Sequence, residues 1–388
     1  MTDLEGVNVA LGVSGSIAAV KTVELAHELR RQGASVRAVV SGSAQGIIHP
    51  WSLEFATENP VVTEITGRVE HVELCGYDGW ADILLLAPAT ANTIGKIASA
   101  VDDTPVTTCA TTALGADIPV VVAPAMHAPM YEHPGVLEAI ETVEQWGVDF
   151  VAPRLEEGKA KIATEDAICT AVARATGVTP LEGQHIVVTS GATSESIDPV
   201  RVLTNRSSGT MGRAVAHACH VLGARVTLVH DGPDVPYADV RQVESAAQML
   251  EATLDLTPAA DALVSAAAIG DYTLESSPEK LRSGEPRTLE LEPVPKLLDT
   301  VRESHPDLTI VAFKAETSGE DEAMVDAART LLERVGAAFV VANDASVMGR
   351  EQTRALLVHA DSVAAFEGEK EALARELGES LGVILEGE

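Results

Sequence analysis

Two stretches of this chain repeat one local order: a short apolar strand, a Gly/Ser loop, an amphipathic helix and a second apolar strand. In the first stretch, residues 7–13 predict a buried strand, 14–16 a turn, 17–31 a helix and 34–40 the next strand. Strands that alternate with helices form a parallel sheet covered on both faces. This order restricts the chain to the α/β class.

The pattern restarts near the middle of the chain, at residues 185–189 (HIVVT). A chain of 388 residues is too long for one ordinary core, and the segment 175–183 (ATGVTPLEG) has the composition of a linker. We therefore expect two doubly wound parallel-sheet domains, over 1–178 and 183–388. Further strands are predicted at 82–87, 119–123, 225–229, 262–266, 309–313 and 338–342, and further helices at 90–100, 134–146 and 211–222.

Charge narrows the possible partners. Acidic residues outnumber basic ones by 58 to 27, which gives a net charge of −31. Such a balance opposes binding to nucleic acid or to an anionic membrane. A surface this acidic is best tolerated in concentrated salt, where the Debye length is short, so we expect a halophilic source. An acidic protein of an ordinary cytoplasm is the alternative.

Cysteine usage and hydropathy bear on the compartment. Cys75, Cys109, Cys169 and Cys219 are scattered without the spacing of a zinc site or a disulfide framework. The beginning of the chain is acidic where a signal peptide would be basic, and no apolar run approaches the roughly 20 residues that span a bilayer. We expect a cytoplasmic protein.

The Gly/Ser loop of the first half is a candidate anion site. A loop such as GVSGSIAAVK presents backbone N–H groups at the start of a helix, which suits a phosphate. Because GxGxxG is absent, an ordinary tight turn is an equally good interpretation of this loop alone. The specific signal comes later, in HVELCGYDGWADILLLAPATANTIGKIASAVDD and VVVAPAMHAPMY.

These motifs resemble the flavin-containing cysteine decarboxylases, in particular the decarboxylase half of bifunctional phosphopantothenoylcysteine decarboxylase/phosphopantothenate–cysteine ligases. The resemblance covers about 1–175 and implies a flavodoxin-like domain that binds FMN as an electron sink. It implies that His71 is the catalytic base, a task that suits imidazole near neutral pH. The cofactor-binding residues that it implies are Ser14, Gly15, Ser16, Ala89, Thr90, Ala91 and Asn92.

The first half departs from this family at two places. The family's PxMNxxMW motif reads PAMHAPMY here, so Met126 and His127 are expected at the substrate carboxylate, with His127 as the donor in place of Asn. The family's ACGxxGxGR clamp reads PRLEEGKAKI, which puts Arg154 where a proton-donating Cys would be. The clamp is expected to persist through Gly158, Lys159 and Lys161, with its acid unidentified.

The second half resembles the phosphopantothenate–cysteine ligases, a Rossmann-like domain, over about 183–388. Its opening, GQHIVVTSGATSESIDPVRVLTNRSSGTMGRAVA, carries the resemblance, supported by AAAIGDYTL, PEKLRS, AFKAET and VANDAS. The resemblance assigns Asn205 to the acyl carbonyl, Lys280 to the triphosphate, Asp271 to the cytidine and Phe313 to nucleotide packing, with Arg334 as a substitute for a missing Lys. The other substrate-binding residues that it implies are Arg201, Ser207, Ser208, Gly209, Ala267, Pro295, Lys296, Leu297 and Leu298.

The implied reactions follow one another. The ligase half would activate 4'-phosphopantothenate with CTP and Mg²⁺ as an acyl-cytidylate, which L-cysteine attacks. The flavin half would decarboxylate 4'-phosphopantothenoylcysteine to 4'-phosphopantetheine. The family also implies a homo-oligomer of flavin-domain trimers and ligase-domain dimers, while the sequence identifies no metal ligands.

Two other functions are weighed against this one. The missing clamp Cys favours a ligase whose flavin-binding domain is regulatory and not catalytic. A nicotinamide oxidoreductase would need GxGxxG and a Tyr-x-x-x-Lys pair, and the second half has neither motif.

Overall fold

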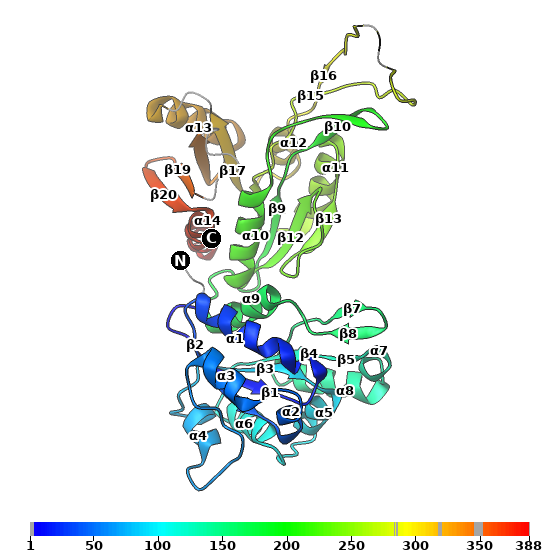
Figure 1. The fold of residues 1–388 in the computed structure, drawn as a ribbon. Coiled ribbons are helices and arrows are strands. Elements are labelled where there is room, and N and C mark those ends of the chain that lie inside the picture. Colours follow the sequence, from blue (N-terminus) through cyan, green and yellow to red (C-terminus); the bar gives the residue numbers. More distant parts are fainter. Residues whose placement is uncertain (1–3, 283, 285, 317–319, 345–351, 388) are drawn as a thin grey trace. The chain divides into compact units, whose positions relative to one another are not determined.

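The computed structural model describes residues 4–282, 284, 286–316, 320–344 and 352–387. It divides into two compact units, Met1–Gly177 and Val178–Glu388, each of which is described by itself (Figure 1). The division falls within the segment 175–183. Four residues of the motifs quoted above, Ser283, Thr317, Ala345 and Ser346, lie outside the described residues.

The first unit is built on a five-stranded parallel sheet with the order β2-β1-β3-β4-β6. Each long strand is a run of buried aliphatic residues, as expected for a sheet that is covered on both faces. The strands are β1 (Asn8–Val13), β2 (Ser35–Val40), β3 (Ile83–Ala89), β4 (Val120–Pro124) and β6 (Asp149–Phe150).

Helices cover both faces of this sheet. The helix α6 packs across the central strands within one core cluster, while α1 and α9 pack together and α9 reaches β3 and β4. The helix predicted at 17–31 begins as a 3-10 turn, η1 (Ile17–Lys21). The α-helices are α1 (Thr22–Arg31), α2 (Gly42–Gln45), α3 (Pro50–Thr57), α4 (Glu70–Cys75), α5 (Ala91–Ala98), α6 (Pro105–Gly115), α7 (Ala128–Tyr131), α8 (Pro134–Glu144) and α9 (Glu165–Thr176).

A small antiparallel sheet stands apart from the main sheet of the first unit. It has the order β5-β8-β7, with β5 (Met126–His127), β7 (Arg154–Glu156) and β8 (Lys159–Lys161). The hairpin of β7 and β8 turns through Glu157 and Gly158, both with positive φ. No strand was predicted here, because the residues of RLEEGKAK are mostly charged and do not form an apolar face.

The second unit is built on an eight-stranded sheet with the order β13-β12-β9-β14-β17-β18-β19-β20. The five pairings from β13 to β18 are parallel, as predicted, and β19 and β20 add an antiparallel edge. The strands are β9 (His185–Thr189), β12 (Arg225–His230), β13 (Asp239–Gln242), β14 (Ala262–Ser265), β17 (Thr309–Glu316), β18 (Phe339–Asp344), β19 (Gln352–Val358) and β20 (Val363–Glu369).

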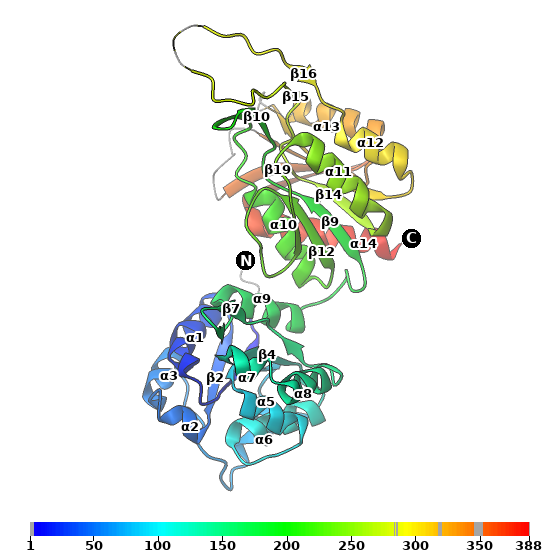
Figure 2. The ribbon, with the colours of Figure 1, turned by 90° about the vertical axis from the view of Figure 1, so that its right-hand side faces the viewer.

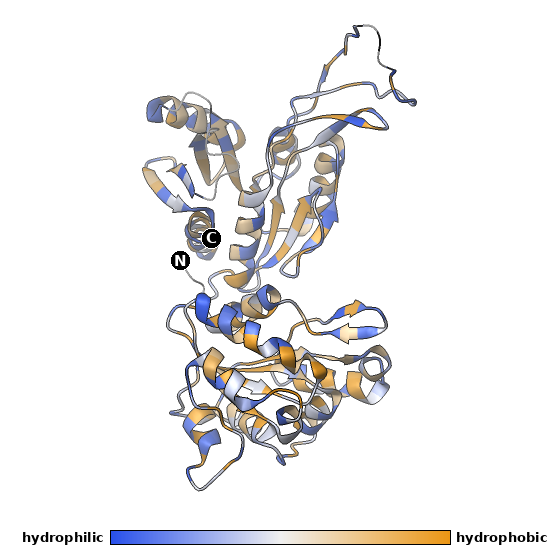
Figure 3. Ribbon diagram, in the orientation of Figure 1, coloured by the Kyte–Doolittle hydropathy of each residue, from blue (hydrophilic) through white to orange (hydrophobic). Residues whose placement is uncertain are grey.

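Two core clusters lie on the two faces of this sheet. One contains residues of α10 and α14, and the other contains residues of α11, α12 and α13. Figure 3 shows the central strands of both sheets in the orange of apolar residues, which confirms the α/β class. The helices are α10 (Thr210–Val221), α11 (Ala246–Leu256), α12 (Leu297–Ser304), α13 (Asp321–Val335) and α14 (Lys370–Glu386), with the 3-10 turn η2 (Thr257–Ala259).

Two hairpins leave the second sheet. One pairs β10 (Ser194–Asp198) with β11 (Arg201–Thr204), and the other pairs β15 (Tyr272–Thr273) with β16 (Glu292–Pro293). The long segment between β15 and β16, called the arm here, projects from the second unit and is drawn in yellow in Figure 2. None of the described helices combines the length and the apolar character needed to cross a bilayer.

The excess of acidic residues leads to a first testable prediction, on stability. Raising KCl from about 0.1 M to about 1 M shortens the Debye length from ~10 Å to ~3 Å and so weakens the repulsion within a chain of net charge −31. The thermal midpoint of unfolding is therefore expected to rise with KCl, as followed by circular dichroism. A parallel series in sorbitol controls for solute exclusion, and a midpoint that falls or stays constant with salt would contradict the prediction.

Candidate functional site

The carboxyl edge of the first sheet contains a point where the strand order reverses. From β1 the chain crosses to β2 on one side and then to β3 on the other, so the loops that follow β1 and β3 separate. In doubly wound sheets such a point forms a crevice, and in the order 2-1-3-4-5 it is where FMN binds in flavodoxin-like folds. The loop 14–16 and the segment 89–92, both predicted cofactor-binding, follow these two strands.

Hydrogen bonds of Ser14 join the two loops. Its hydroxyl donates to the carbonyl of Pro88 at 2.8 Å and accepts from the backbone N–H of Thr90 at 3.0 Å. Its own N–H donates to the Pro88 carbonyl at 3.2 Å. Ser14 is buried, so its hydroxyl holds the loops together while the backbone of the loop faces the crevice.

Gly15 allows a third loop to approach closely. A Cβ built at Gly15 would lie 2.4 Å from the Oγ of Ser43, which is closer than real Cβ contacts. Ser43 follows β2, and its hydroxyl lies 3.2 Å from that of Ser41, the N-cap of α2. Ser16 caps η1 and donates to the carbonyl of Ala125 at 3.0 Å. Ser41 and Ser43 were missed in the sequence, because Ser after a strand is ordinary loop composition.

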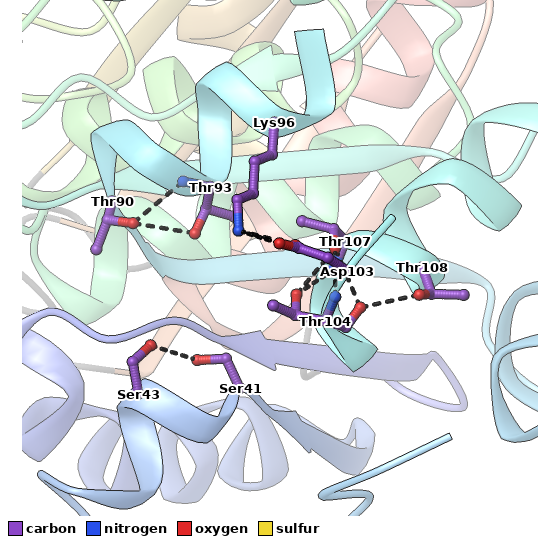
Figure 4. A network of polar contacts seen from close by, with 9 residues as sticks. All are labelled: Ser41, Ser43, Thr90, Thr93, Lys96, Asp103, Thr104, Thr107 and Thr108. Atoms are coloured by element: carbon purple, nitrogen blue, oxygen red, sulfur yellow. Dashed lines mark hydrogen bonds and ion pairs between the residues drawn. The ribbon is translucent and has the colours of Figure 1, made fainter. Parts of the chain in front are cut away.

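Figure 4 shows the hydroxyl network at this edge. Thr90 caps α5 by accepting from the N–H of Thr93, and the hydroxyls of these two residues lie 3.0 Å apart. Lys96, one turn later, pairs with Asp103 at 2.7 Å. Ala89 is buried, whereas the side chain of Asn92 is exposed. The segment 89–92 is therefore held rigidly, with Asn92 open to a ligand.

The small sheet brings the predicted substrate residues together. Met126 pairs with Ala160, and His127 pairs with Lys159, across β5 and β8. The side chains of His127 and Lys159 are exposed, and neither makes an ion pair within the described part of the chain. Directly opposite residues of an antiparallel pair stand about 5 Å apart, so these two side chains are neighbours.

His127 differs from two other histidines at helix starts. His49 and His133 each accept a backbone N–H through Nδ1, at 3.3 Å from Trp51 and 3.1 Å from Gly135. His127 occupies the same N-cap position of α7 without a side-chain cap. Its imidazole is thus available to a ligand.

Two of the three positive side chains of the clamp, Arg154 and Lys161, are already paired with carboxylates. Lys161 contacts Glu156 and Glu157, both at 3.0 Å, and Arg154 contacts Glu156 at 3.2 Å. The hydrogen bonds of Glu157 and Glu156 raise the pKa of Lys161. An anionic group that binds at Lys161 has to displace one of these carboxylates.

His71 lies away from the crevice of its own unit. It is on α4, not at a strand edge, and α4 ends where the N–H groups of Trp80 and Ala81 donate to the carbonyls of Glu73 and Leu74. Those contacts come just before the amino end of β3, whereas Thr90 follows its carboxyl end, seven residues of strand later. At about 3.3 Å per residue the two ends are ~20 Å apart. Figure 1 shows α4 and α5 well separated.

The turn before His71 is tightly fixed. Glu70 is buried and accepts from the N–H and the hydroxyl of Thr66, and these hydrogen bonds lower the pKa of Glu70 to about 2. Val69 has φ 52, which is rare for a β-branched residue and costs of order 1–3 kcal/mol. The Nδ1 of His71 is buried and has no hydrogen-bond partner among the described residues. The turn that precedes His71 is thus fixed, while the buried Nδ1 is left without a partner in the described part of the chain.

All four cysteine thiols are free and buried. Cys75 and Cys109 contact each other within the first core, and hydrogen bonding to Cys75 together with burial raises the pKa of Cys109. Burial likewise raises the pKa of Cys169, and it raises that of Cys219 to about 12. A buried thiol with a raised pKa is a poor proton donor to a substrate.

Two adjoining cavities open at the carboxyl edge of the second sheet. They measure about 310 Å³ and about 370 Å³ and share the lining residues Ala267, Ile269, Asp271, Phe313 and Lys314. Both lie beyond the carboxyl end of β14, next to the carboxyl half of β17. The predicted residues on the first cavity are Ser207, Ser208, Gly209, Ala267, Asp271 and Phe313, and those on the second are Ala267, Asp271, Pro295, Lys296, Leu297, Leu298, Phe313 and Arg334.

Three predicted residues lie beside the cavities without lining them: Asn205, Lys280 and Arg201. The amide of Asn205 donates to the carbonyl of Ala268 at 2.8 Å, and Ala268 lines the first cavity. Lys280 is exposed on the arm. The amide of Asn205 is therefore fixed beside the first cavity, whereas Lys280 lines neither cavity.

A buried carboxylate anchors the arm next to Lys280. Asp198 accepts from the N–H of Leu281 at 3.1 Å and from Arg201, whose guanidinium also donates to the Leu281 carbonyl. Burial alone would raise the pKa of Asp198, but hydrogen bonds donated by Val200, Leu281 and Arg201 lower it to about 2. Arg201 thus positions Lys280.

Cations of the second cavity are also paired internally. Lys296 contacts Asp271, and Arg334 contacts Asp299 at 2.7 Å. Lys314, Asn343, Thr353 and Lys370 line the first cavity and were missed in the sequence. The sequence could have indicated Lys314 as a cavity residue, because it directly follows Phe313 in the same predicted motif.

Two family models match the chain, one for each unit. The family described as Flavoprotein matches residues 1–177. The family described as DNA/pantothenate metabolism flavoprotein C-terminal domain matches residues 181–383.

Curated relatives match over nearly the whole length. The coenzyme A biosynthesis bifunctional protein CoaBC of Thermococcus kodakarensis is 49% identical over 364 residues, which are 92% of this chain and 90% of that protein. The protein of the same name from Methanocaldococcus jannaschii is 33% identical, over 97% of this chain and 94% of its own. A solved C-terminal domain of a CoaBC protein is 31% identical and covers 54% of this chain and 100% of its own, with a TM-score of 0.46.

Proposed function

This chain belongs to the family of coenzyme A biosynthesis bifunctional proteins CoaBC, and on that premise we propose that its two units catalyse consecutive steps of one pathway. It is a bifunctional enzyme of coenzyme A biosynthesis, with a flavoprotein unit for the decarboxylation and a C-terminal unit for the ligation. The observation that supports the assignment is that many of the predicted residues cluster at the carboxyl edge of each sheet, whereas His71, Lys280 and Arg201 lie outside these clusters.

In the ligase unit, we propose that CTP and 4'-phosphopantothenate occupy the two adjoining cavities. Phe313 packs on the nucleotide, Asp271 and Lys296 meet its ribose or base, and Lys280 swings in from the arm to the triphosphate. The carboxylate becomes an acyl-cytidylate, and the amide of Asn205 stabilises the oxygen that gains charge when cysteine attacks.

Mg²⁺ is part of this proposal as a partner of the triphosphate. Among the described residues there is no group of three or more His, Cys, Asp or Glu that could hold a metal. Mg²⁺ commonly keeps several waters and binds through substrate phosphates with one or two carboxylates. Asp271 lines both cavities but is paired with Lys296, so Mg²⁺ would have to displace that lysine to bind there.

In the flavoprotein unit, the crevice at β1 and β3 fits FMN. Gly15 and the hydroxyls of Ser41 and Ser43 form a cradle that a Cβ would fill, and Ser16 and Asn92 face the same edge. FMN supplies the reversible two-electron redox chemistry that makes loss of CO2 from a cysteine amide feasible. His127, Lys159 and Lys161 hold the substrate carboxylate and phosphate, and His71 accepts the substrate proton.

The separation of His71 from the crevice supports a shared site. Because one copy cannot bring its His71 to its own cradle, we propose that flavoprotein units assemble as trimers, in which one copy supplies His71 to the cradle of the next. Trp51 and Phe55, four residues apart on α3, are 74% and 77% exposed and offer an apolar contact face. Ligase units are proposed to pair as dimers.

One experiment tests the proposed function as a whole. The FMN-loaded chain is incubated with 4'-phosphopantothenate, cysteine, Mg²⁺ and either CTP or ATP, and products are identified by mass. Ligated and decarboxylated products with CTP support the proposal. Ligated product alone would favour the second candidate, a ligase with a regulatory flavin unit, for which the burial of every cysteine is the specific observation.

The buried thiols lead to a second prediction, on the proton donor. A variant with all four cysteines replaced by Ala or Ser is expected to decarboxylate within about threefold of the wild-type rate, because all four thiols are buried and the pKa values of Cys109, Cys169 and Cys219 are raised. CO2 release and the oxidised enethiol are measured by mass. If replacing Cys169 alone makes the enethiol accumulate, Cys169 is the proton donor. The alignment that puts Arg154 at the position of the family's clamp Cys would then be wrong.

A further inference from the structure

The first cavity of the ligase unit is lined by a largely buried lysine that has no partner among the described residues. Lys370 is the first residue of α14 and is only 7% exposed, the one buried lysine among the described residues. Within the described part of the chain its ammonium makes no hydrogen bond or ion pair, whereas Lys296 and Lys314, on the same cavities, are paired with carboxylates.

Burying most of a lysine side chain removes part of the hydration of its ammonium, which is unfavourable without a compensating partner. Side chains of this kind are rarely buried unless they are paired. Lys370 lines the cavity of about 310 Å³. A ligand anion in that cavity would supply the partner that the protein lacks.

Two helix starts meet at the same place. The helices α10 and α14 pack together: Gly378 lies against Leu222 and Cys219, and Gly382 lies against Pro180. Pro180 lies outside α10, so it is the shared cavity that brings the starts of the two helices together. Thr210, Met211 and Lys370 all line the cavity.

The first turns of these helices are open to a ligand. The N-cap residues, Gly209 of α10 and Glu369 of α14, make no side-chain cap hydrogen bond. The first N–H groups of a helix need partners, and the helix dipole there favours a negative charge. Two such ends and one ammonium together form a site for a phosphate group.

We propose that Lys370 binds a phosphate group of a ligase substrate in the cavity between the starts of α10 and α14. The inference rests on the ligase activity proposed above. The phosphate comes from the triphosphate of CTP or from the 4'-phosphate of phosphopantothenate, since both substrates carry the same chemical group.

Isothermal titration of the full, FMN-loaded chain tests this role. Lys370→Met is expected to weaken the binding of CTP or of 4'-phosphopantothenate by about 10- to 100-fold, the loss typical of a charged hydrogen bond. Pantothenate, which lacks the phosphate, is expected to bind the variant and the wild type alike. If only CTP binds the variant more weakly, Lys370 contacts the triphosphate. If only 4'-phosphopantothenate binds more weakly, Lys370 contacts the 4'-phosphate.

Two further variants control for structural damage. Glu371→Gln changes an exposed neighbour on α14 and is expected to leave all affinities unchanged, while Lys370→Arg retains the charge and should restore most of the binding. If Lys370→Met does not fold, reductive methylation of wild-type Lys370 replaces the variant. Slower labelling in the presence of CTP or phosphopantothenate supports the role.

Two results would overturn the inference: unchanged affinity of Lys370→Met for both substrates, or labelling of Lys370 that neither substrate slows. Failure of the proposed function itself looks different. In that case the wild-type chain forms no ligated product with CTP, phosphopantothenate and cysteine.

Discussion

Lys280→Gln is expected to abolish pyrophosphate release, and Asn205→Asp to release pyrophosphate but accumulate phosphopantothenoyl-cytidylate. In the first step a carboxylate approaches an anionic α-phosphate, so a cation is needed there. Lys280 is exposed next to Leu281, where Asp198 and Arg201 anchor the arm. In the second step the charge develops on the former carboxylate oxygen, where the amide of Asn205 suffices.

The expected size of the second effect follows from oxyanion chemistry. Loss of one such donor typically slows a step by about 10²- to 10³-fold. Asn205 is held at 2.8 Å from the carbonyl of Ala268, on the wall of the first cavity, so it is already placed before the substrate binds. That placement makes the acyl intermediate long-lived enough in Asn205→Asp to trap.

Mass spectrometry of quenched mixtures, with and without cysteine, measures both steps. Arg287→Gln, another exposed cation of the arm, serves as the matched control and should change neither step. Lys280→Arg keeps the positive charge and should retain part of the first step, pyrophosphate release. The roles are assigned wrongly if the intermediate forms in Lys280→Gln or is missing from Asn205→Asp.

The second large effect is expected in the flavoprotein unit. His71→Asn should retain FMN, seen as an unchanged flavin absorbance, while CO2 release falls by about 10²- to 10⁴-fold, the usual contribution of a general base. FMN is retained because His71 is far from the cradle of its own unit. His133→Asn, at the N-cap of α8 where Asn retains a capping acceptor, is the control and should keep full activity. Wild-type CO2 release from a yellow His71→Asn protein would rule out the role.

Mixed oligomers show whether the site is shared between copies. Gly15→Val should lose FMN, because its Cβ would meet the Oγ of Ser43 at 2.4 Å. Co-expression of His71→Asn with Gly15→Val should regain part of the activity that each variant lacks alone, since some trimers then join an intact cradle to an intact His71. No recovery in purified mixed oligomers would place both functions in one copy.

The sequence predicts the fold well where a strand is short, apolar and ended by Gly or Ser. β9 has the predicted bounds, and β1 and β12 differ from theirs by one residue. The antiparallel edge of β19 and β20 was not predicted, although both strands contain short apolar runs (ALLV and VAAF); β20 is mostly exposed. The first turn of the helix after Ser16 is 3-10, a difference that composition does not encode.

The sites were predictable to different degrees. The lining of both ligase cavities follows from motifs, because each motif ends a strand at the same edge. His71 was expected at a strand edge and is on a helix, since helix α4 is only six residues long and shows no periodicity. Lys370 looked like a solvated charge in EGEKEALAREL, and only the packing of α14 against α10 buries it.

The internal pairing of site cations changes how an anionic substrate is bound. Lys161, Lys296 and Arg334 each hold a carboxylate of the protein before any substrate arrives. Binding there is an exchange of one anion for another. Dissolved salt weakens the pair that breaks and the pair that forms to a similar extent. The affinity of these sites is thereby buffered against changes in ionic strength, which a pocket of unpaired cations would not be.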